Sequence, residues 1–367
     1  MSRQHNFSAG PAVLPPSVIE ELKNALLEFR DCNAGLMEIS HRSAGFSEVI
    51  QSAENRLRNL ISIPDDYHVL FLQGGASLQF YMLPLNLLTP EETGAYLMTG
   101  TWSTKALKEA KRCSQSQSIW EDSTNQSVPK NSEYSIPKEA TYLHYTSNNT
   151  IYGTQYSERP STNIPLVVDM SSDICSRKID VQKYDVIYAG AQKNLGPSGV
   201  TAIILSPWAV EKSNEVNRKR PGGLPSMLNY GLMVEKNSMF NTPNTFGIFA
   251  LDRMLAWLEN AGGVESIEKI NQQKASLIYQ ELDSSDFWIP HAKTNSRSLM
   301  NITWRIARPE LEATFIEEAR KEGLLALKGH RSVGGIRSSL YNACPLESAV
   351  ALRDFMVLFR ERHGHSL

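Results

Sequence analysis

The sequence predicts an α/β fold built around a mainly parallel sheet. Short apolar runs rich in β-branched residues alternate with helical patterns, which is typical of βαβ units. The chain has 367 residues, which is enough for two domains. The expected strands are HVLFL, GAYLM, TYLHYT, IPLVVD, YDVIYAG and GVTAIIL, at residues 68–72, 94–98, 141–146, 164–169, 184–190 and 199–205.

The first helix is expected to begin beside Ser17. Ser17 and Glu20 form a capping-box pattern, in which each side chain bonds a free backbone N–H at the helix start. The apolar residues that follow recur at the spacing of one helical face; they are Val18, Leu22, Leu26 and Phe29. This face should lie against the sheet or against a partner.

Two later segments differ in residue pattern from the part of the chain that is rich in strands. The stretch 120–140 is polar and contains prolines, so it is expected to be a surface excursion between strands. Beyond about residue 258, long helical patterns are interleaved with only short strand candidates. We therefore predict a large domain at 16–258 and a smaller α+β domain at 259–367, on which the N-terminal arm, residues 1–15, packs.

The composition limits the classes of partner. Lys and Arg number 37 against 39 Asp and Glu, so no broad basic surface for nucleic acid or an anionic membrane is expected. No segment approaches about 18 apolar residues, so no membrane span is expected. The cysteines are widely spaced, which favours neither a metal site nor a disulfide framework and points to a reducing, cytoplasmic setting; they are Cys32, Cys113, Cys175 and Cys344.

Lys193 is the first candidate for chemistry. It lies in IYAGAQKNLGPSG, residues 187–199, between an apolar run and a Gly/Pro-rich loop. A lysine at the edge of a buried sheet is partly desolvated, which lowers its pKa and makes the neutral amine available for Schiff-base chemistry. An ordinary surface lysine on a turn is the alternative that this stretch alone leaves open.

Two further features join Lys193. Asp169 ends the expected strand 164–169, where sheets of this type bind ligands, and a carboxylate there can pair with the protonated ring nitrogen of pyridoxal phosphate. Small residues at 74–77 separate another strand from a helical pattern, so backbone N–H groups could approach a phosphate. A turn residue and a plain strand-to-helix turn are the corresponding alternatives.

Nine motifs in the same order resemble the phosphoserine aminotransferase family, class V aminotransferases that use pyridoxal phosphate and have fold type I. The resemblance covers residues from about 6 to 345, nearly the whole chain. The motifs are FSAGPAVLP, EISHRS, FLQGGAS, MTGTWSTKALKEA, HYTSNNTIYGT, DMSSDI, YAGAQKNLGPSG, NTPNTF and GHRSVGGIRSSLYNA.

The resemblance implies a role for each residue that would contact the cofactor. Lys193 would bind it covalently and move the substrate's α-proton, Asp169 would hold the ring nitrogen, Trp102 would stack on the ring, and Thr150 would bond its phenolic oxygen. The phosphate would be held by Gly75, Ala76 and Gln192, with Asn241 and Thr242 from the other subunit. Some family members have Arg where this chain has Ala76, so this phosphate site would depend more on neutral donors.

A cationic loop is the candidate for substrate binding. His330, Arg331 and Arg337 lie close together among glycines, and the arginine fork pairs bidentately with carboxylate, although a solvated basic loop would look the same. By resemblance, Arg337 would bind the α-carboxylate. His330 and Arg331, with His41 and Arg42 of the other subunit, would receive the substrate's phosphate or the γ-carboxylate of glutamate.

The expected activity is transfer of the amino group from L-glutamate to 3-phosphohydroxypyruvate in serine biosynthesis, by a homodimer with active sites at the interface. A second role, forming 4-phosphohydroxy-L-threonine for pyridoxal phosphate biosynthesis, stays open. The alternatives are an alanine–glyoxylate type aminotransferase and a cysteine desulfurase, for which Cys344 is the only late candidate. A non-catalytic nucleotide-binding module should show GxGxxG in its first βα turn, where this chain has none.

Overall fold

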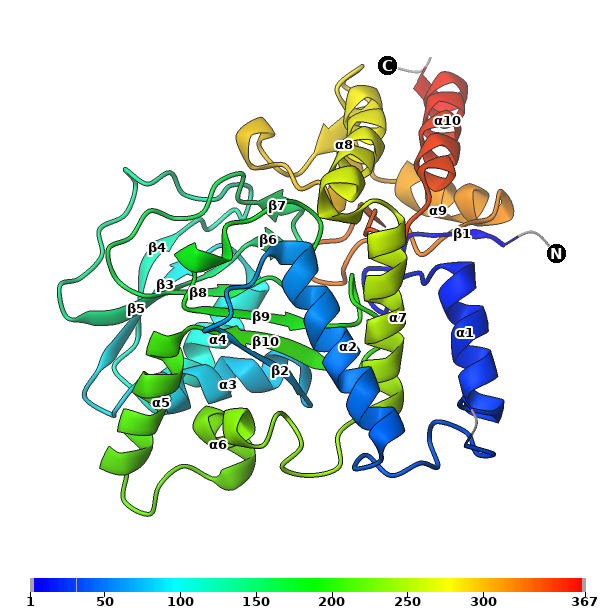
Figure 1. Ribbon diagram of the computed structural model, residues 1–367. Helices are drawn as coiled ribbons and strands as arrows, with labels where there is room; N and C mark the ends of the chain where they lie inside the picture. The colour runs from blue at the N-terminus through cyan, green and yellow to red at the C-terminus, as the bar shows by residue number, and fades with distance from the viewer. Residues whose placement is uncertain (1–2, 31, 365–367) are drawn as a thin grey trace.

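The computed structural model describes residues 3–30 and 32–364 and confirms the α/β fold. A seven-stranded sheet has the order β2-β10-β9-β8-β5-β3-β4, and only β10 is antiparallel to its neighbours (Figure 1). The strands are β2 (His68–Leu72), β3 (Thr93–Met98), β4 (Gln117–Glu121), β5 (Ala140–Thr146), β8 (Leu166–Asp169), β9 (Val186–Gly190) and β10 (Thr201–Leu205).

Two hydrophobic layers cover the two faces of this sheet, because successive strand residues point to opposite sides. In β2, Phe71 belongs to one layer and its neighbour Leu70 to the other. The first layer contains α2 (Ala44–Ile61) and α7 (Thr245–Asn260). The second contains α3 (Gly75–Leu87), α4 (Thr101–Ala110), α5 (Pro207–Lys219) and α6 (Tyr230–Glu235).

The C-terminal part forms a smaller α+β unit at the top of Figure 1. Its antiparallel sheet has the order β11-β12-β14, and β1 pairs with β13, so the N-terminal arm is tied to this unit. The proposed division at residue 258 lies near the end of α7 and stays a prediction. The elements are β1 (His5–Asn6), α8 (Gly263–Leu282), β11 (Trp288–Pro290), β12 (Asn301–Ile306), α9 (Leu311–Lys321), β13 (Leu324–Leu325), β14 (Ile336–Ser339) and α10 (Leu346–His363).

The capping box expected at the first helix is wrong. Helix α1 (Pro16–Leu27) begins two residues earlier than a helix capped by Ser17 would, and no side chain caps it. A proline at the first helical position supplies the start, because its fixed φ suits a helix and it has no N–H to leave unbonded. Glu20 instead pairs with Lys23 at 2.9 Å. The inner face also differs, because Ala25 is buried and Leu26 is exposed.

The strand β4 was absent from the predicted set, and its last two residues fell in the expected surface excursion. Its sequence, QSIWE, has no buried position, so it lacks the alternation that identifies a half-buried strand. It lies at the edge of the sheet and pairs only with β3. Two short pieces in the loops, β6 (Asn148–Asn149) and β7 (Thr154–Gln155), also pair with each other.

Among the described residues, no helix is long and apolar enough to cross a membrane.

Candidate active site

A cavity of about 300 Å³ lies at the carboxyl ends of the central strands. Asp169 ends β8, Thr146 ends β5, Lys193 follows β9, and Gly75 begins α3 just after β2; all four line this cavity. Parallel strands end at one edge of the sheet, so residues far apart in the sequence meet there. The structure therefore brings the lysine, the carboxylate and the glycine turn together, as the sequence predicted.

Lys193 extends into the cavity with one hydrogen bond. Its Nζ donates to Oγ1 of Thr150 at 2.6 Å and lies 5.9 Å from the ring centroid of Trp102. Burial lowers the pKa of Lys193, Asp169 raises it and the nearby Arg337 lowers it, and the net result is a pKa of about 8. With this pKa about a tenth of the amine is neutral at pH 7, whereas an ordinary lysine is almost wholly protonated. A nucleophilic or basic lysine reacts through this neutral form.

Asp169 is buried, and its Oδ1 accepts a hydrogen bond from the backbone N–H of Ser171 at 2.9 Å. Burial raises the pKa of Asp169, and the bonds from Ser171 and the charge of Lys193 oppose that rise. Among the described residues, no cationic side chain forms an ion pair with it. Because a buried carboxylate without a cation is costly, its place on the cavity wall suits a positively charged group in the cavity.

The start of α3 forms one end of the cavity. Gly74 and Gly75 have φ of 90° and 64°, in the left-handed region, and no side chain caps the helix. A Cβ on Gly75 would meet no atom within 4 Å, so backbone conformation rather than crowding favours glycine there. The first N–H groups of α3 are thus available to an anion. Ala76 and Gln192 also line this cavity.

Trp102 and Thr150 form further parts of the wall. Trp102 lies in the first turn of α4, its indole Nε1 is buried without a hydrogen-bond partner among the described residues, and Nζ of Lys105 lies 4.7 Å from its ring centroid. Thr150 is buried just after β6. Its backbone oxygen accepts a bond from Nη1 of Arg337 at 3.3 Å, so Thr150 contacts both Lys193 and Arg337.

The cationic loop contributes two of its three predicted residues. Arg337, in β14, and His330 line the cavity, whereas Arg331 is exposed and outside the lining. Burial lowers the pKa of His330, and the charges of Arg337 and Arg331 lower it further. His330 Nδ1 lies 2.7 Å from the hydroxyl of Ser332, within the same turn.

The residues assigned to the other subunit do not line the cavity of their own chain. His41 and Arg42 precede α2, and the exposed pair Asn241 and Thr242 precedes α7. Helices α2 and α7 pack together and begin at the same, lower end of the molecule in Figure 1. The four residues therefore belong to segments that lead into these helices at one end of the folded molecule, away from the smaller C-terminal unit.

The Aminotransferase class-V family model matches residues 4–352. The chain belongs to the class-V aminotransferase family. This aminotransferase is 50% identical to a phosphoserine aminotransferase of Lysinibacillus sphaericus, over 98% of the chain and 99% of that protein. The resemblance found in the sequence is thereby confirmed.

Solved structures agree with this membership. The phosphoserine aminotransferase of Bacillus circulans subsp. alkalophilus is 44% identical and has a TM-score of 0.93, with 98% of this chain and 99% of that chain covered. The pyridoxal-phosphate-bound phosphoserine aminotransferase of Trichomonas vaginalis is 34% identical, with a TM-score of 0.90 over 97% and 100% of the two chains. The non-catalytic nucleotide-binding alternative is therefore wrong.

The structure adds cavity residues of this aminotransferase that were not predicted. Ala9 and Gly10 of the N-terminal arm line the cavity, and a Cβ on Gly10 would lie 3.4 Å from Cγ of Lys193. Asn148 also lines it and donates to Asn301 of β12 at 2.8 Å. Ala9 and Gly10 belong to the FSAGP motif, which is one of the nine motifs of the resemblance and could have indicated them. Nothing local in the sequence indicates the contact between Asn148 and Asn301.

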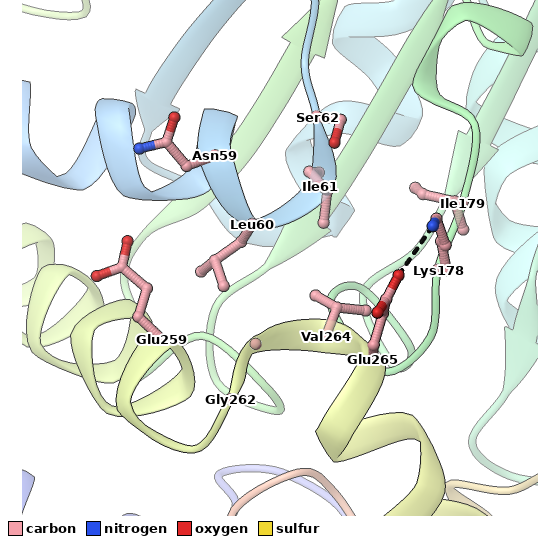
Figure 2. Close-up of a pocket in the computed structure, with 11 residues that line it drawn as sticks. Asn59, Leu60, Ile61, Ser62, Lys178, Ile179, Glu259, Gly262, Val264 and Glu265 are labelled. Atoms are coloured by element: carbon pink, nitrogen blue, oxygen red, sulfur yellow. Dashed lines mark hydrogen bonds and ion pairs between the residues drawn. The ribbon is translucent and has the colours of Figure 1, made fainter.

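Other features of this aminotransferase do not offer comparable chemistry. The cavity of about 400 Å³ in Figure 2 lies between the end of α2 and the junction of α7 with α8. Its charged lining residues include Lys178 and Glu265, which pair with each other at 2.9 Å. Cys344 is buried outside the lining of the active-site cavity, which disfavours the mobile nucleophile of a desulfurase.

Proposed function

We propose that this chain uses pyridoxal 5'-phosphate to transfer the amino group of L-glutamate to 3-phosphohydroxypyruvate. The products are 2-oxoglutarate and 3-phospho-L-serine, which places the reaction in serine biosynthesis. The single observation that carries the proposal is that Lys193, Asp169 and Arg337 line one cavity. The 50% identity to a relative named phosphoserine aminotransferase supports the choice of substrates.

The cavity residues suit pyridoxal phosphate in three respects. Asp169 is a buried carboxylate without an ion-pair partner among the described residues, and the cofactor offers a pyridinium nitrogen. The uncapped start of α3 offers N–H groups to a phosphate. Lys193 has the lowered pKa that condensation with an aldehyde needs. In this assignment Trp102 stacks on the ring, and Thr150 bonds its phenolic oxygen.

When bound, pyridoxal phosphate supplies an aldehyde carbon for amino groups and a conjugated ring that withdraws electrons from the substrate's α-carbon. The protein supplies position and proton transfer. Arg337 binds the α-carboxylate, because its planar fork pairs with both oxygens. Lys193 Nζ removes the α-proton and returns it, and the hydroxyl of Thr150 orients that amine.

The distal end of the substrate needs cations from two chains. In our proposal, His330 and Arg331 of one subunit and His41 and Arg42 of the other bind the phosphate of one substrate or the γ-carboxylate of the other. Asn241 and Thr242 reach the cofactor phosphate across the same interface, beside Gly75, Ala76 and Gln192. Such a site requires a homodimer. Exposed large apolar side chains in the segments that precede α2 and α7 support it; they are Leu27 and Met37 before α2, and Met227 and Phe240 before α7.

The function is tested by following the visible spectrum of the holoenzyme through each half-reaction. Glutamate should convert the aldehyde form of the cofactor to the amine form, and 3-phosphohydroxypyruvate should reverse that change at far lower concentration than hydroxypyruvate. Equal reversal by both would remove the substrate assignment, and no spectral change would remove the aminotransferase. The keto acid that yields 4-phosphohydroxy-L-threonine, added to the same assay, tests the second role.

The shared site is tested by mixing two inactive variants, K193A and R42A. A mixed dimer would contain one site with Lys193 from one chain and Arg42 from the other. Random reassociation should therefore restore about a quarter of the wild-type activity. If mixing restores no activity although each variant dimerises, the two residues serve the same chain and the proposed geometry is wrong.

We also propose a cytoplasmic location. All four cysteines lie in the described part of the chain and are free, and Cys32 is exposed. Free exposed thiols are the usual state of proteins in reducing compartments.

A further inference from the structure

A second groove, lined by several cationic side chains, lies outside the active-site cavity. We call it the basic groove. It has a volume of about 460 Å³ and shares no lining residue with the active-site cavity. Its charged lining comprises four cations and two carboxylates: Arg159, Arg177, Lys178, Arg297, Asp180 and Glu268.

Two of the four cations form short ion pairs. Lys178 bonds Glu265 at 2.9 Å, turned toward the neighbouring cavity of Figure 2. Arg297 makes two bonds of 2.6 Å to Asp283, although its buried Nε has no hydrogen-bond acceptor among the described residues. The charges of Arg159 and Arg177 are therefore the ones to consider.

The two carboxylates in the lining bond to backbone N–H groups. Asp180 accepts from the N–H of Gln182 at 3.2 Å, and Glu268 accepts from the N–H of Lys178 at 3.1 Å. Neither forms an ion pair with Arg159 or Arg177 among the described residues. The groove therefore keeps two cations that its own carboxylates do not neutralise.

Arg159 and Arg177 both have hydrogen-bond donors to spare. The guanidinium of Arg159 donates to the carbonyl of Pro160 at 3.1 Å, and none of the described carboxylates pairs with it. Arg177 donates to the carbonyl of Ser157 at 3.1 Å and lies 3.5 Å from Asp173, a long contact for an ion pair. An arginine has five N–H donors, so each of these two side chains can donate further hydrogen bonds to an oxyanion.

Both arginines belong to one lining, which also contains Tyr184. The bond from Arg177 to the carbonyl of Ser157 ties it to the segment that carries Arg159, two residues further along the chain. Tyr184, Ile179 and Leu299 supply the less polar part of the lining. The volume exceeds what one inorganic ion fills, so a ligand with a short carbon body fits better.

We propose that the basic groove binds a small organic anion whose carboxylate or phosphate lies between Arg159 and Arg177. Its carbon body would contact Ile179 and Leu299. The groove is a second anion site, separate from the substrate cations of the active-site cavity, and the proposal does not depend on which amino acid the enzyme makes.

The occupant of this groove would act on the catalytic lysine. Arg177 is the groove's link to Asp173, a buried carboxylate that also accepts a bond from Gln155 at 3.1 Å. The charge of Asp173 raises the pKa of Lys193. A bound anion adds negative charge on the same side, so it should raise the pKa of Lys193 and weaken the base at neutral pH.

Binding is tested by calorimetric titration of the holoenzyme with methyl phosphate and, separately, with glutarate. Both probes can also enter the active-site cavity, so the wild type should bind a second equivalent per chain. R159Q should weaken only that second equivalent, by about tenfold or more, because a charged hydrogen bond is lost. The control R353Q makes the same charge change at Arg353, which pairs with Asp354 on α10, and should behave as the wild type.

The two probes also identify the class of anion. Tighter binding of methyl phosphate would indicate a phosphate site, and tighter binding of glutarate would indicate a carboxylate site. R177K is a second variant that keeps the charge beside Asp173 but lacks the planar fork, so it should also weaken the second equivalent. Identical isotherms for the wild type, R159Q and R353Q would overturn the proposal.

The effect on Lys193 is measured through the pH dependence of kcat at saturating substrates, which keep the probe out of the active site. Saturating methyl phosphate should move the acidic limb, where protonation of Lys193 reduces kcat, to higher pH in the wild type and not in R159Q. An unchanged profile in the wild type would refute the link through Arg177 and Asp173.

Discussion

A half-buried lysine and a fully buried lysine have the same shifted pKa and different surroundings. Burial lowers the pKa of Lys193 and of Lys274 to about 8 in each case. Lys274, on α8, is fully buried and donates to the carbonyls of Leu340, Tyr341 and Cys344, at 3.0, 2.8 and 3.1 Å. Lys193 has one hydroxyl partner and faces a cavity.

The comparison shows that a shifted pKa alone does not identify a catalytic lysine. Every N–H of the Lys274 ammonium is bonded to a carbonyl in the turn between β14 and α10, so this lysine holds the turn in place. Lys193 lies where its amine can reach a ligand, and a carboxylate and an arginine line the same space. The two lysines therefore differ in two respects: only Lys193 faces a cavity, and only Lys193 has N–H groups without a hydrogen-bond acceptor among the described residues.

The largest expected effect comes from K193A. Removing the amine should lower kcat by at least about 10³-fold, because the same group binds the cofactor and transfers the proton. Steady-state kinetics with glutamate and the phosphorylated keto acid would measure the loss. The control K183A removes an exposed lysine from the loop before β9 and should leave the rate unchanged. Activity above a trace in K193A would contradict the role of Lys193.

The second prediction concerns Lys274. In K274M, three buried carbonyls lose their donor, so the free energy of unfolding should fall by about 3 kcal/mol. Urea denaturation of the holoenzyme measures this loss as a lower midpoint. K269M, at an exposed position on the same helix, is the control. If K274M were as stable as K269M, Lys274 would not be the structural counterpart of Lys193.

A smaller effect is expected where Lys193 meets its one partner. T150V removes the hydroxyl that accepts from Nζ but keeps the backbone oxygen that binds Arg337, so kcat should fall roughly tenfold with little loss of stability. The control T201V removes a buried hydroxyl that has no partner among the described residues, and its activity should not change. An unaffected kcat in T150V would show that this bond does not position the amine.

The last prediction is a pH dependence of stability in the cofactor-free enzyme. The pKa of Lys193 is about 8 when folded and near 10.5 when unfolded, so between these values the unfolded chain binds more protons. The free energy of unfolding should therefore rise with pH in this window, relative to K193M. Urea midpoints of the wild type and K193M, measured from pH 7 to 10.5, should differ by an amount that changes with pH. A difference that stays constant would mean that water in the cavity keeps the pKa of Lys193 near its ordinary value.

Much of the fold follows from local patterns in the sequence. All six predicted strands are present, because each has a continuous buried run, and the face of α10 formed by Ala349, Leu352, Met356 and Phe359 is fully buried. The edge strand β4 was missed because an exposed strand has no apolar pattern. The start of α1 was misplaced because Pro16 initiates the helix in place of a capping side chain.

The sequence by itself determined the chemistry at the strand ends. Asp169 ends a predicted strand, and Lys193 and Gly75 follow two others, so parallel strands bring the three residues to one edge without further information. The tertiary structure decided the rest. Only folding places Gly10 against Lys193, Asn148 against Asn301, and Arg159 in one groove with Arg177. It alone distinguishes Lys274 from Lys193, because hydrogen bonding and access to a cavity depend on chain segments that are distant in the sequence.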